Sequence, residues 1–292
     1  MISIIIIVKD DRGIQNTLEK LKNIKKPEKI EIIVVDASNG KLDDIKNNFK
    51  DVHWIYYRNK SLKKITIPEQ RNLGVKNAKG DPIIFLDANC IPSKNWLVKL
   101  FEPYIKDEEN IVAGSVEPFN KNTYNNLNDR KYLVSKYLDE CPTINVLIRK
   151  KVFTNVGKFD EHLTFGSDVD FMWRAVEKGY KIRFSRDALI YHEWGNFKDE
   201  LKRSFKYGNA RIILYKKYPY RWKNLFSKDI IYLVYPVYII LLPITFFFPF
   251  YPLFILIPVI KNIQKQPLNT IHKLVIMHLV MGLGFIKGFL FN

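Results

Sequence analysis

The uneven distribution of apolar residues constrains this chain more than any other feature. No charged residue occurs from Ile230 to Ile260, and a second apolar run, Leu274 to Phe291, contains only His278 and Lys287 as titratable side chains. Each run exceeds the length of about 18 residues above which an apolar segment indicates a membrane-spanning helix. The sequence therefore predicts a C-terminal membrane region over residues 229–292, with transmembrane helices in the runs 230–260 and 274–291.

The first run does not fit one simple span. As a continuous helix it would be about 46 Å long, against a hydrocarbon core of about 30 Å. Prolines interrupt it at Pro243, Pro249, Pro252 and Pro258. A kinked or tilted helix and a hairpin broken near residues 248–252 both fit this pattern. We therefore expect a protein of the cell membrane that is either multi-pass or hairpin-anchored.

The second run contains a helix-packing motif. Gly284 and Gly288 stand at GxxxG spacing, which lets two helices approach closely. Such spacings also arise by chance, so the motif alone identifies no partner helix.

A basic and aromatic segment precedes the first run. Residues 198–228 hold ten Lys and Arg against two acids, and five Tyr and Trp side chains are interleaved with them. Because Lys and Arg are enriched on the cytoplasmic side of membrane segments, this segment predicts that residues 1–228 are cytoplasmic. We expect an interfacial helix on anionic lipid headgroups, with a solvated basic helix and a nucleic-acid-binding face as the alternatives.

Composition limits what the rest of the chain can be. The chain has 292 residues and a formal net charge of +17, yet 47% of its residues are hydrophobic, which excludes a disordered polycation. Two cysteines, Cys90 and Cys141, cannot form a disulfide framework and favour a reduced, cytosolic setting. No DNA- or RNA-binding motif accompanies the charge, so we expect no nucleic-acid partner.

Residues 1–197 alternate between apolar runs typical of strands and amphipathic patterns typical of helices. The expected strands are 2–8, 30–35, 52–57, 83–86 and 188–191, and the expected helices are 14–24, 42–49 and 68–78. This alternation predicts an α/β fold with a Rossmann-like, mostly parallel central sheet flanked by helices. Ligands of such sheets bind at the carboxyl ends of the strands.

Polar side chains follow three of these strands. Lys9 follows the first strand, Asp36 the second, and Asp87 and Asn89 the fourth. A carboxylate at a strand end can accept hydrogen bonds from a base or ribose, but turns and helix caps use the same residues, so both interpretations stay open. The chain has neither a Walker A motif nor a GxGxxG motif, which removes the usual sequence support for P-loop hydrolysis and dinucleotide redox chemistry.

Several ordered blocks together resemble the family 2 glycosyltransferases, which have the GT-A fold. The blocks are Gln70–Val75, Ala78–Asp81, Ile84–Asn89, Asn145–Arg149, Val156–Asp160, Gly166–Asp170, Trp173–Arg174, Val176–Tyr180 and Tyr191–His192. The resemblance covers about residues 1–210. It implies an inverting, metal-assisted glycosyltransferase of the hexosyltransferase type that uses a UDP- or GDP-sugar as donor.

The resemblance also implies a site for a divalent cation. The family's Asp-x-Asp motif here reads Asp87-Ala88-Asn89, and His192 matches a late histidine that completes the metal site. Mn²⁺ or Mg²⁺ held there neutralises the donor diphosphate. Asn89 replaces the second Asp and brings an amide oxygen without charge, so we expect a weaker affinity for metal.

Four residues are the candidates for contacts with the donor nucleotide. They are Lys9, Asp36, Arg71 and Asp87. For Lys9 and Arg71, ordinary surface charges are the alternative interpretation.

The resemblance assigns the general base to Asp168. The family's Glu-Asp pair here reads Ser167-Asp168, with Asp170 as support at the start of a helix. A carboxylate suits proton removal from an acceptor hydroxyl because that proton becomes acidic only as the new bond forms. Trp173 and Arg174 resemble the segment that lines the acceptor site, and a helix cap and a core tryptophan are the structural alternatives.

The membrane segments indicate what the acceptor is. A lipid-borne acceptor, a polyprenyl phosphate or a lipid-linked saccharide, fits a catalytic domain held at a membrane, and membrane lipids are expected partners. Because Asn89 and Ser167 depart from the family pattern, the alternative function is a catalytically impaired protein that binds nucleotide sugar or scaffolds glycan assembly.

Overall fold

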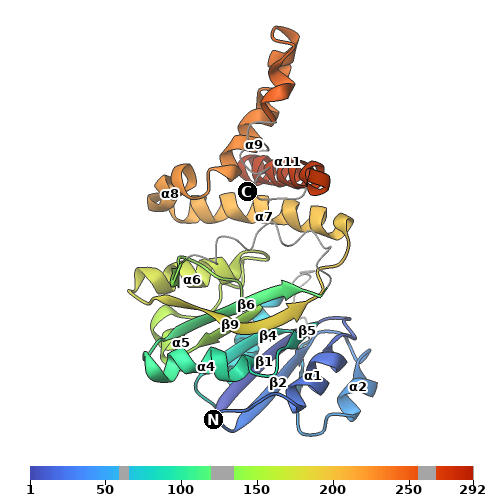
Figure 1. The fold of residues 1–292 in the computed structure, drawn as a ribbon, viewed down its shortest axis with the longest axis vertical. Helices are drawn as coiled ribbons and strands as arrows, with labels where there is room; N and C mark the ends of the chain where they lie inside the picture. The colour runs from blue at the N-terminus through green and yellow to red at the C-terminus, as the bar shows by residue number, and fades with distance from the viewer. Residues whose placement is uncertain (59–65, 120–134, 256–267, 292) are drawn as a thin grey trace. The chain divides into compact units, whose positions relative to one another are not determined.

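The computed structural model describes residues 1–58, 66–119, 135–255 and 268–291. Contacts divide the described residues into two compact units, of which the first ends at Glu193 and the second begins at Trp194. Each unit has its own interior, and we describe them in turn (Figure 1).

The first unit contains all of the strands. Its elements in chain order are β1 (Ile2–Val8), α1 (Ile14–Lys22), β2 (Ile30–Asp36), α2 (Asp43–Asn47), β3 (His53–Tyr56), α3 (Ile67–Asn77), β4 (Ile83–Asp87), β5 (Cys90–Pro92), α4 (Trp96–Lys106), β6 (Ile111–Pro118), β7 (Tyr137–Leu138), β8 (Asn145–Ile148), α5 (Lys150–Val156), α6 (Ser167–Glu177) and β9 (Ile182–His192). The strands and helices predicted up to residue 87 are all present, with ends that differ by a few residues.

The strands form one mixed sheet in the order β3-β2-β1-β4-β8-β6-β9-β5, with β7 paired to β9. Strands β3, β2, β1 and β4 are mutually parallel, as predicted. Beyond β4 the prediction of a mostly parallel sheet is wrong, because β8 runs antiparallel to both of its neighbours and β5 runs antiparallel to β9. The four parallel strands β1 to β4 have the Rossmann-like arrangement. Strand β4 is the outermost of them on the side where the sheet continues, and it pairs with the antiparallel strand β8.

Apolar strands buried on both faces hold the first unit together. Ile4, Ile5 and Ile6 of β1 are fully buried, as expected for a central strand covered by helices on both sides. One core cluster joins β1 and β4 to α5 and α6, and it includes an edge-to-face contact between Phe85 and Phe159 with ring centroids 5.5 Å apart. This core anchors the first turns of α6, where the predicted base lies.

The second unit is helical. Its elements are α7 (Phe197–Lys217), η3 (Pro219–Arg221), α8 (Trp222–Ser227), α9 (Ile231–Ile240), η4 (Leu242–Phe246), η5 (Tyr251–Ile255) and α11 (Leu268–Phe291). The predicted interfacial segment is mostly α7, which starts with a capping box between Asn196 and Asp199.

The prediction of several transmembrane helices is wrong in number. Among the described residues one helix, Ile271–Phe291, is long and apolar enough to cross a membrane, so a multi-pass arrangement is not supported. The first apolar run forms the ten-residue α9 and two short 3₁₀ turns instead, because prolines interrupt the helix at Pro243 and Pro249. Residues 256–260 of that run lie outside the described residues.

Candidate active site

The turn after β4, residues 88–89, is held in place by Thr17 of α1. The fully buried Thr17 hydroxyl donates to the Ala88 carbonyl oxygen at 2.6 Å and accepts from the Cys90 N–H at 3.1 Å. Buried backbone groups that lack a partner are costly, so one threonine satisfies both groups of a turn that has no regular pairing. The bonds set the orientation of Asp87 and Asn89.

Asp87 is the point at which the predicted site residues meet. Burial raises the pKa of the Asp87 carboxyl, Arg71 and His192 lower it, and Asp168 and Asp11 raise it. These charges act on Asp87 because they lie near it, although they come from α3, the end of β9, the start of α6 and the turn after β1. The structure thus brings four predicted residues, Asp87, Arg71, Asp168 and His192, into one cluster.

Helix α3 places Arg71 in this cluster because it packs unusually close to β1. A Cβ atom built on Gly74 would lie 2.5 Å from the Ile5 side chain, so no larger residue fits there. Arg71 is 8% exposed, which shows that it is no ordinary surface charge. Its guanidinium lies 5.6 Å from the centre of the Phe159 ring and donates to the Ser167 hydroxyl at 3.5 Å.

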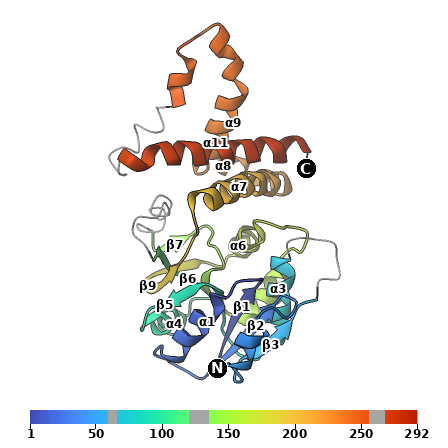
Figure 2. The same ribbon diagram turned by 90° about the vertical axis from the view of Figure 1, so that its right-hand side faces the viewer.

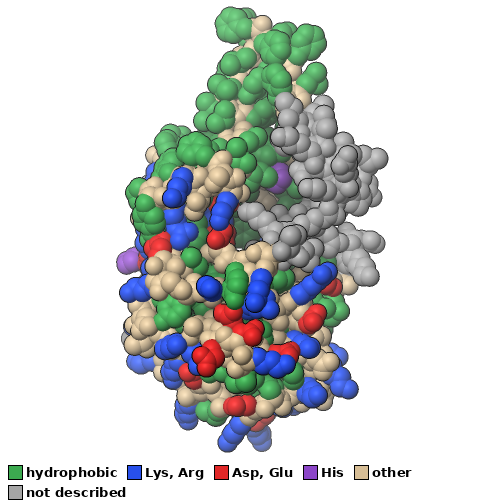
Figure 3. Space-filling model, turned by 60° about the vertical axis from the view of Figure 1, so that its left-hand side comes forward, with side chains coloured by type: hydrophobic (Ala, Val, Ile, Leu, Met, Phe, Trp, Pro, Cys, Tyr) green, Lys and Arg blue, Asp and Glu red, His purple; other side chains and the backbone are tan. Residues whose placement is uncertain are grey.

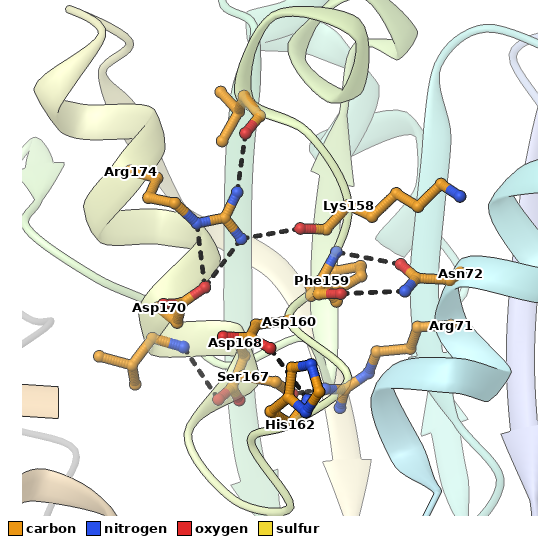
Figure 4. A network of polar contacts seen from close by, with 12 residues as sticks. Arg71, Asn72, Lys158, Phe159, Asp160, His162, Ser167, Asp168, Asp170 and Arg174 are labelled. Carbon is orange, nitrogen blue, oxygen red and sulfur yellow. Dashed lines mark hydrogen bonds and ion pairs between the residues drawn. The ribbon is translucent and has the colours of Figure 1, made fainter. Parts of the chain in front are cut away.

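The next residue on α3, Asn72, holds the loop that precedes α6. Its side chain donates to the Phe159 carbonyl at 2.9 Å and accepts from the Phe159 N–H at 3.0 Å (Figure 4). The same amide nitrogen donates to Glu161 at 2.8 Å. A side-chain amide that pairs with both the N–H and the carbonyl of one residue fixes the loop, and with it the distance between α3 and α6.

The first turn of α6 carries the predicted base. Asp168 is half-buried, and among the described residues the Val169 N–H, at 2.9 Å, is its one hydrogen-bond donor. One carboxylate oxygen is therefore available to accept a proton. Ser167, where the family pattern has Glu, is 2% exposed and faces Arg71 (Figure 4).

Asp170 and Arg174 form a buried clamp one turn further along α6. Asp170 is fully buried and accepts from Arg174 Nε at 3.0 Å and from a terminal nitrogen at 2.8 Å. The same guanidinium donates to the carbonyls of Val156 and Lys158. Asp170 therefore stabilises α6 through its pairing with Arg174. Arg174 holds the loop before it, so any influence on the acceptor acts through the position of α6.

Trp173 is a core side chain that makes a polar contact with Glu140. It is 2% exposed, and its indole N–H donates to Glu140 at 2.8 Å. Glu140 is half-buried, so it lies nearer to solvent than the Trp173 side chain does.

A bulge in β9 delivers His192 to the cluster. The register between β6 and β9 shifts after Gly114, so that Ser115 pairs with Leu189, and the end of β9 then pairs with β5 at Cys90 and His192. Asn145 of β8 stabilises this shift through bonds from its amide group to the carbonyls of Ser115 and Ala188, at 2.8 and 2.9 Å. The bulge re-aims the strand toward the turn that holds Asp87.

The two remaining predicted residues lie at the ends of β1 and β2. Lys9 is exposed at the end of β1. Asp36 is 1% exposed, and its two carboxylate oxygens accept from the Ser38 N–H at 2.7 Å and the Trp54 indole at 3.1 Å. Asp36 thus organises the loop after β2, while Lys9 has the exposure that contact with a ligand requires.

The donor set suits a cation that is shared with a substrate. No three His, Cys, Asp or Glu side chains lie close enough to form a metal site by themselves within residues 1–58, 66–119, 135–255 and 268–291. Asp87, the Asn89 amide and His192 offer two oxygens and one imidazole nitrogen. Mg²⁺ and Mn²⁺ accept such ligands and usually complete their shell with phosphate oxygens and water.

A hollow on the first unit lies away from these residues. It measures about 530 Å³ and is lined by residues of the β9 bulge and the start of α4, among them Lys94, Lys99 and Arg186. None of the predicted site residues lines it. The chemistry of the Asp87 cluster, rather than the size of a hollow, identifies the candidate site.

The residues that position the site were not among those predicted from the sequence. Asp11 acts on Asp87, and it follows a predicted strand in the same way as Lys9, so its place in the chain was a usable signal. Asn72 and Asn145 lie inside the sequence blocks that resemble the family, but no function was predicted for either residue. Thr17 and Glu140 carry no signal in the sequence, because their partners are distant in the chain.

Comparisons with known proteins place the chain in a family. A family model described as Glycosyl transferase family 2 matches residues 3–169, and one described as Glycosyl transferase family group 2 matches residues 123–287. Glycosyltransferase AglE of Haloferax volcanii is 28% identical over 72% of this chain and 73% of its own. A Methanococcus voltae enzyme, dolichyl N-acetyl-alpha-D-glucosaminyl phosphate 3-beta-D-2,3-diacetamido-2,3-dideoxy-beta-D-glucuronosyltransferase, is 26% identical over 98% of this chain and 96% of its own. Among solved structures, S. aureus TarS aligns over 70% of this chain with a TM-score of 0.54 and 14% identity, and the chain spans 39% of the TarS chain.

Proposed function

Since this chain belongs to glycosyltransferase family 2, we propose that it transfers a sugar, with inversion, from a UDP- or GDP-sugar to a lipid-linked acceptor. One observation carries the proposal: Arg71, His192 and Asp168, from three other elements, each lie near enough to Asp87 at the carboxyl end of β4 to change the pKa of its carboxyl. This is the place at which α/β sheets bind ligands.

The donor diphosphate is the ligand that this cluster suits. Arg71 supplies a fixed positive charge in a buried setting, where it stabilises an anion more strongly than it does in water. Lys9 offers a second, exposed cation at the neighbouring strand end, and Asp36 orders the loop on the side where we place the base and ribose. Asp87, Asn89 and His192 are the residues that would hold Mn²⁺ or Mg²⁺, which supplies charge neutralisation of the diphosphate when bound.

Asp168 is the proposed base. Its carboxylate removes the proton of the acceptor hydroxyl as that oxygen bonds to the anomeric carbon, and the bond from that carbon to the diphosphate breaks. The displacement needs no nucleophile from the protein and inverts the anomeric centre. Asp170 and Arg174 keep α6, and so Asp168, in place, and Trp173 with Glu140 does the same from the core side.

The acceptor follows from a relative and from the second unit. The Methanococcus voltae enzyme acts, by its name, on a dolichyl phosphate-linked sugar and matches nearly the whole chain. We therefore propose a polyprenyl phosphate or a lipid-linked saccharide as acceptor. We also keep the division into a catalytic domain (1–197), a basic juxtamembrane segment (198–228) and a membrane region (229–292), with the catalytic domain cytoplasmic.

A donor screen tests the proposal. Membranes that contain the protein are incubated with UDP- or GDP-sugars, Mn²⁺ and lipid-linked saccharides, in parallel with polyprenyl phosphates, and the released nucleoside diphosphate and the lipid product are measured. We expect release with one donor class, loss of release in EDTA, recovery with Mn²⁺, and none in Asp168→Asn. Metal-dependent donor binding without release or product would favour the catalytically impaired alternative, which Asn89 and Ser167 motivate.

A further inference from the structure

Helices α7 and α11 of the second unit pack side by side over most of their lengths. The contacts advance in the same chain direction along both helices, from Phe197 with Lys273, through Phe205 with Gly284, to Lys216 with Phe289. Corresponding ends of the two helices are therefore adjacent. The Lys216 ammonium donates to the Phe289 carbonyl at 2.7 Å and so satisfies an end group of α11.

The two helices touch at their backbones. A Cβ atom on Gly208 would lie 1.9 Å from the Met281 carbonyl oxygen, and one on Gly284 would lie 2.0 Å from the Phe205 carbonyl oxygen. The GxxxG spacing noted in the sequence is thus a close-approach motif, and its partner is the basic helix α7 of the same chain. Neither helix can move far without the other.

This pairing determines where α11 can lie in a bilayer. Helix α7 carries the exposed Lys206 near its middle, and exposed lysines at both ends, Lys198 and Lys202 at its start and Lys216 and Lys217 at its end. If α11 crossed the membrane, α7 would have to cross beside it and carry lysines into the hydrocarbon, which is strongly unfavourable. An α11 that lies in the plane of the headgroups keeps these ammonium groups in water and on phosphates.

The apolar hairpin, residues 230–255, supplies the part that enters the hydrocarbon. Its two limbs are joined by Tyr238 and Tyr251, whose rings stack at 5.4 Å and whose hydroxyls donate to carbonyls of the opposite limb. Its tip exposes Phe246 and Phe247 at 87% and 85%. Figure 3 shows these hydrophobic side chains gathered at one end of the second unit, with no charged side chain among them.

The apolar hairpin is attached to helices α7 and α11 at its base and extends away from them. Asp229, directly before α9, is buried, accepts from the Tyr215 hydroxyl at 2.8 Å and pairs with Arg211 at 3.3 Å. In both Figure 1 and Figure 2, α7 and α11 lie across the vertical direction while α9 climbs from them. The ten residues of α9 are about 15 Å long, which is half of a hydrocarbon core of about 30 Å.

We propose that the second unit is a monotopic anchor for one leaflet of an anionic phospholipid bilayer, in which α7 and α11 lie in the headgroup plane and the apolar hairpin enters the hydrocarbon without crossing it. The charges of the surface and its partner are complementary, because Lys216, Lys217, Lys223 and Lys228 are exposed beside the root of the hairpin. The proposal rests on the second unit alone and is independent of the catalytic function.

A map of sidedness tests it. Lys223→Cys, Lys265→Cys and Asn292→Cys are each expressed in the full chain, and inside-out and right-side-out membrane vesicles are treated with an impermeant maleimide. The native Cys90 and Cys141 are buried, so the unmodified protein is the blank. We expect all three cysteines to react from the cytoplasmic face only. Reaction of Asn292→Cys from the opposite face would show that α11 spans, and reaction of Lys265→Cys there would show that the first run spans; either result overturns the proposal.

A second experiment tests the hairpin tip. The double variant Phe246→Ser, Phe247→Ser alters only exposed side chains, so the fold is not at risk. We expect its binding to vesicles of phosphatidylcholine and phosphatidylglycerol to fall by about tenfold or more. The matched control is Ile105→Ser, an exposed apolar side chain of the first unit at 57%, which should bind as the unmodified protein does. Unchanged vesicle binding would show that the tip does not enter the bilayer. Loss of a dimer with vesicle binding intact would show that the tip contacts protein. Either result would refute the proposal.

Discussion

Replacement of Thr17 by valine should separate the contribution of the hydroxyl hydrogen bonds from the contribution of the side-chain volume. Valine keeps the shape of threonine but removes the hydroxyl that donates to the Ala88 carbonyl at 2.6 Å and accepts from the Cys90 N–H at 3.1 Å. Both groups would then be buried without a partner, at a cost of about 1–3 kcal/mol each. We therefore expect Thr17→Val to lose about 2–6 kcal/mol of unfolding free energy.

Thr17→Ser is the matched control, because serine keeps both bonds and loses one methyl group. Its expected cost is about 1 kcal/mol. Denaturant titrations followed by tryptophan fluorescence measure the difference between the two variants, and donor-dependent nucleotide release measures the effect on the turn that holds Asp87. If Thr17→Val were as stable and as active as Thr17→Ser, the two bonds would not fix that turn.

Three further predictions concern the active site. Asp168→Asn should lower turnover by about 10²–10⁴-fold without a change in melting temperature, because the amide oxygen still accepts from the Val169 N–H; activity within tenfold of the unmodified protein would remove Asp168 as base. The raised pKa of Asp87 means that the folded state binds this proton more tightly than the unfolded chain, so stability falls as pH rises from the ordinary value of 3.8 through the folded pKa. In EDTA, Asp87→Asn should therefore be more stable than the unmodified protein at pH 7 and equal to it in acid, and urea titrations that show the same difference at every pH would contradict this. Arg174→Met should cost about 3–5 kcal/mol because Asp170 is left buried and charged, and adding Asp170→Asn should restore part of the loss.

The parallel half of the sheet could be predicted because its signal is local. Each strand from β1 to β4 is an apolar run between helical patterns, and Asp87 and Asp36 end two of them. No strand was assigned between residues 87 and 188. Strand β5 has three residues, β6 becomes polar after Gly114, and the antiparallel position of β8 beside β4 depends on contacts that periodicity does not contain.

The members of the candidate site were found through a resemblance rather than through spacing. Asp87, Asp168 and His192 are far apart in the chain, and nothing local indicates that they meet. The resemblance also led to an acceptor-lining interpretation of Trp173 and Arg174, whereas the structure gives both side chains internal partners, Glu140 and Asp170. Sequence blocks mark where a family is constrained, but only packing shows whether the constraint serves a ligand or the fold.

The arrangement of the membrane region also depends on packing that its sequence does not reveal. Hydropathy alone gave two runs long enough to span, because it counts apolar residues and ignores neighbours. The backbone contact between Gly208 and Met281 ties the second run to a charged helix, and no property of the run itself reveals that.

The contact between α7 and α11 also bears on how the chain is made. Glycine in the middle of a helix costs about 1 kcal/mol relative to alanine, so α7 is a weak helix until α11 covers Gly208. Gly284 leaves the ribosome about 75 residues after Gly208, which takes roughly 4–15 s at about 5–20 residues per second. During that interval the apolar hairpin has already been synthesised and can reach the bilayer. Helix α7 can therefore complete its packing against α11 only after the apolar hairpin has been synthesised.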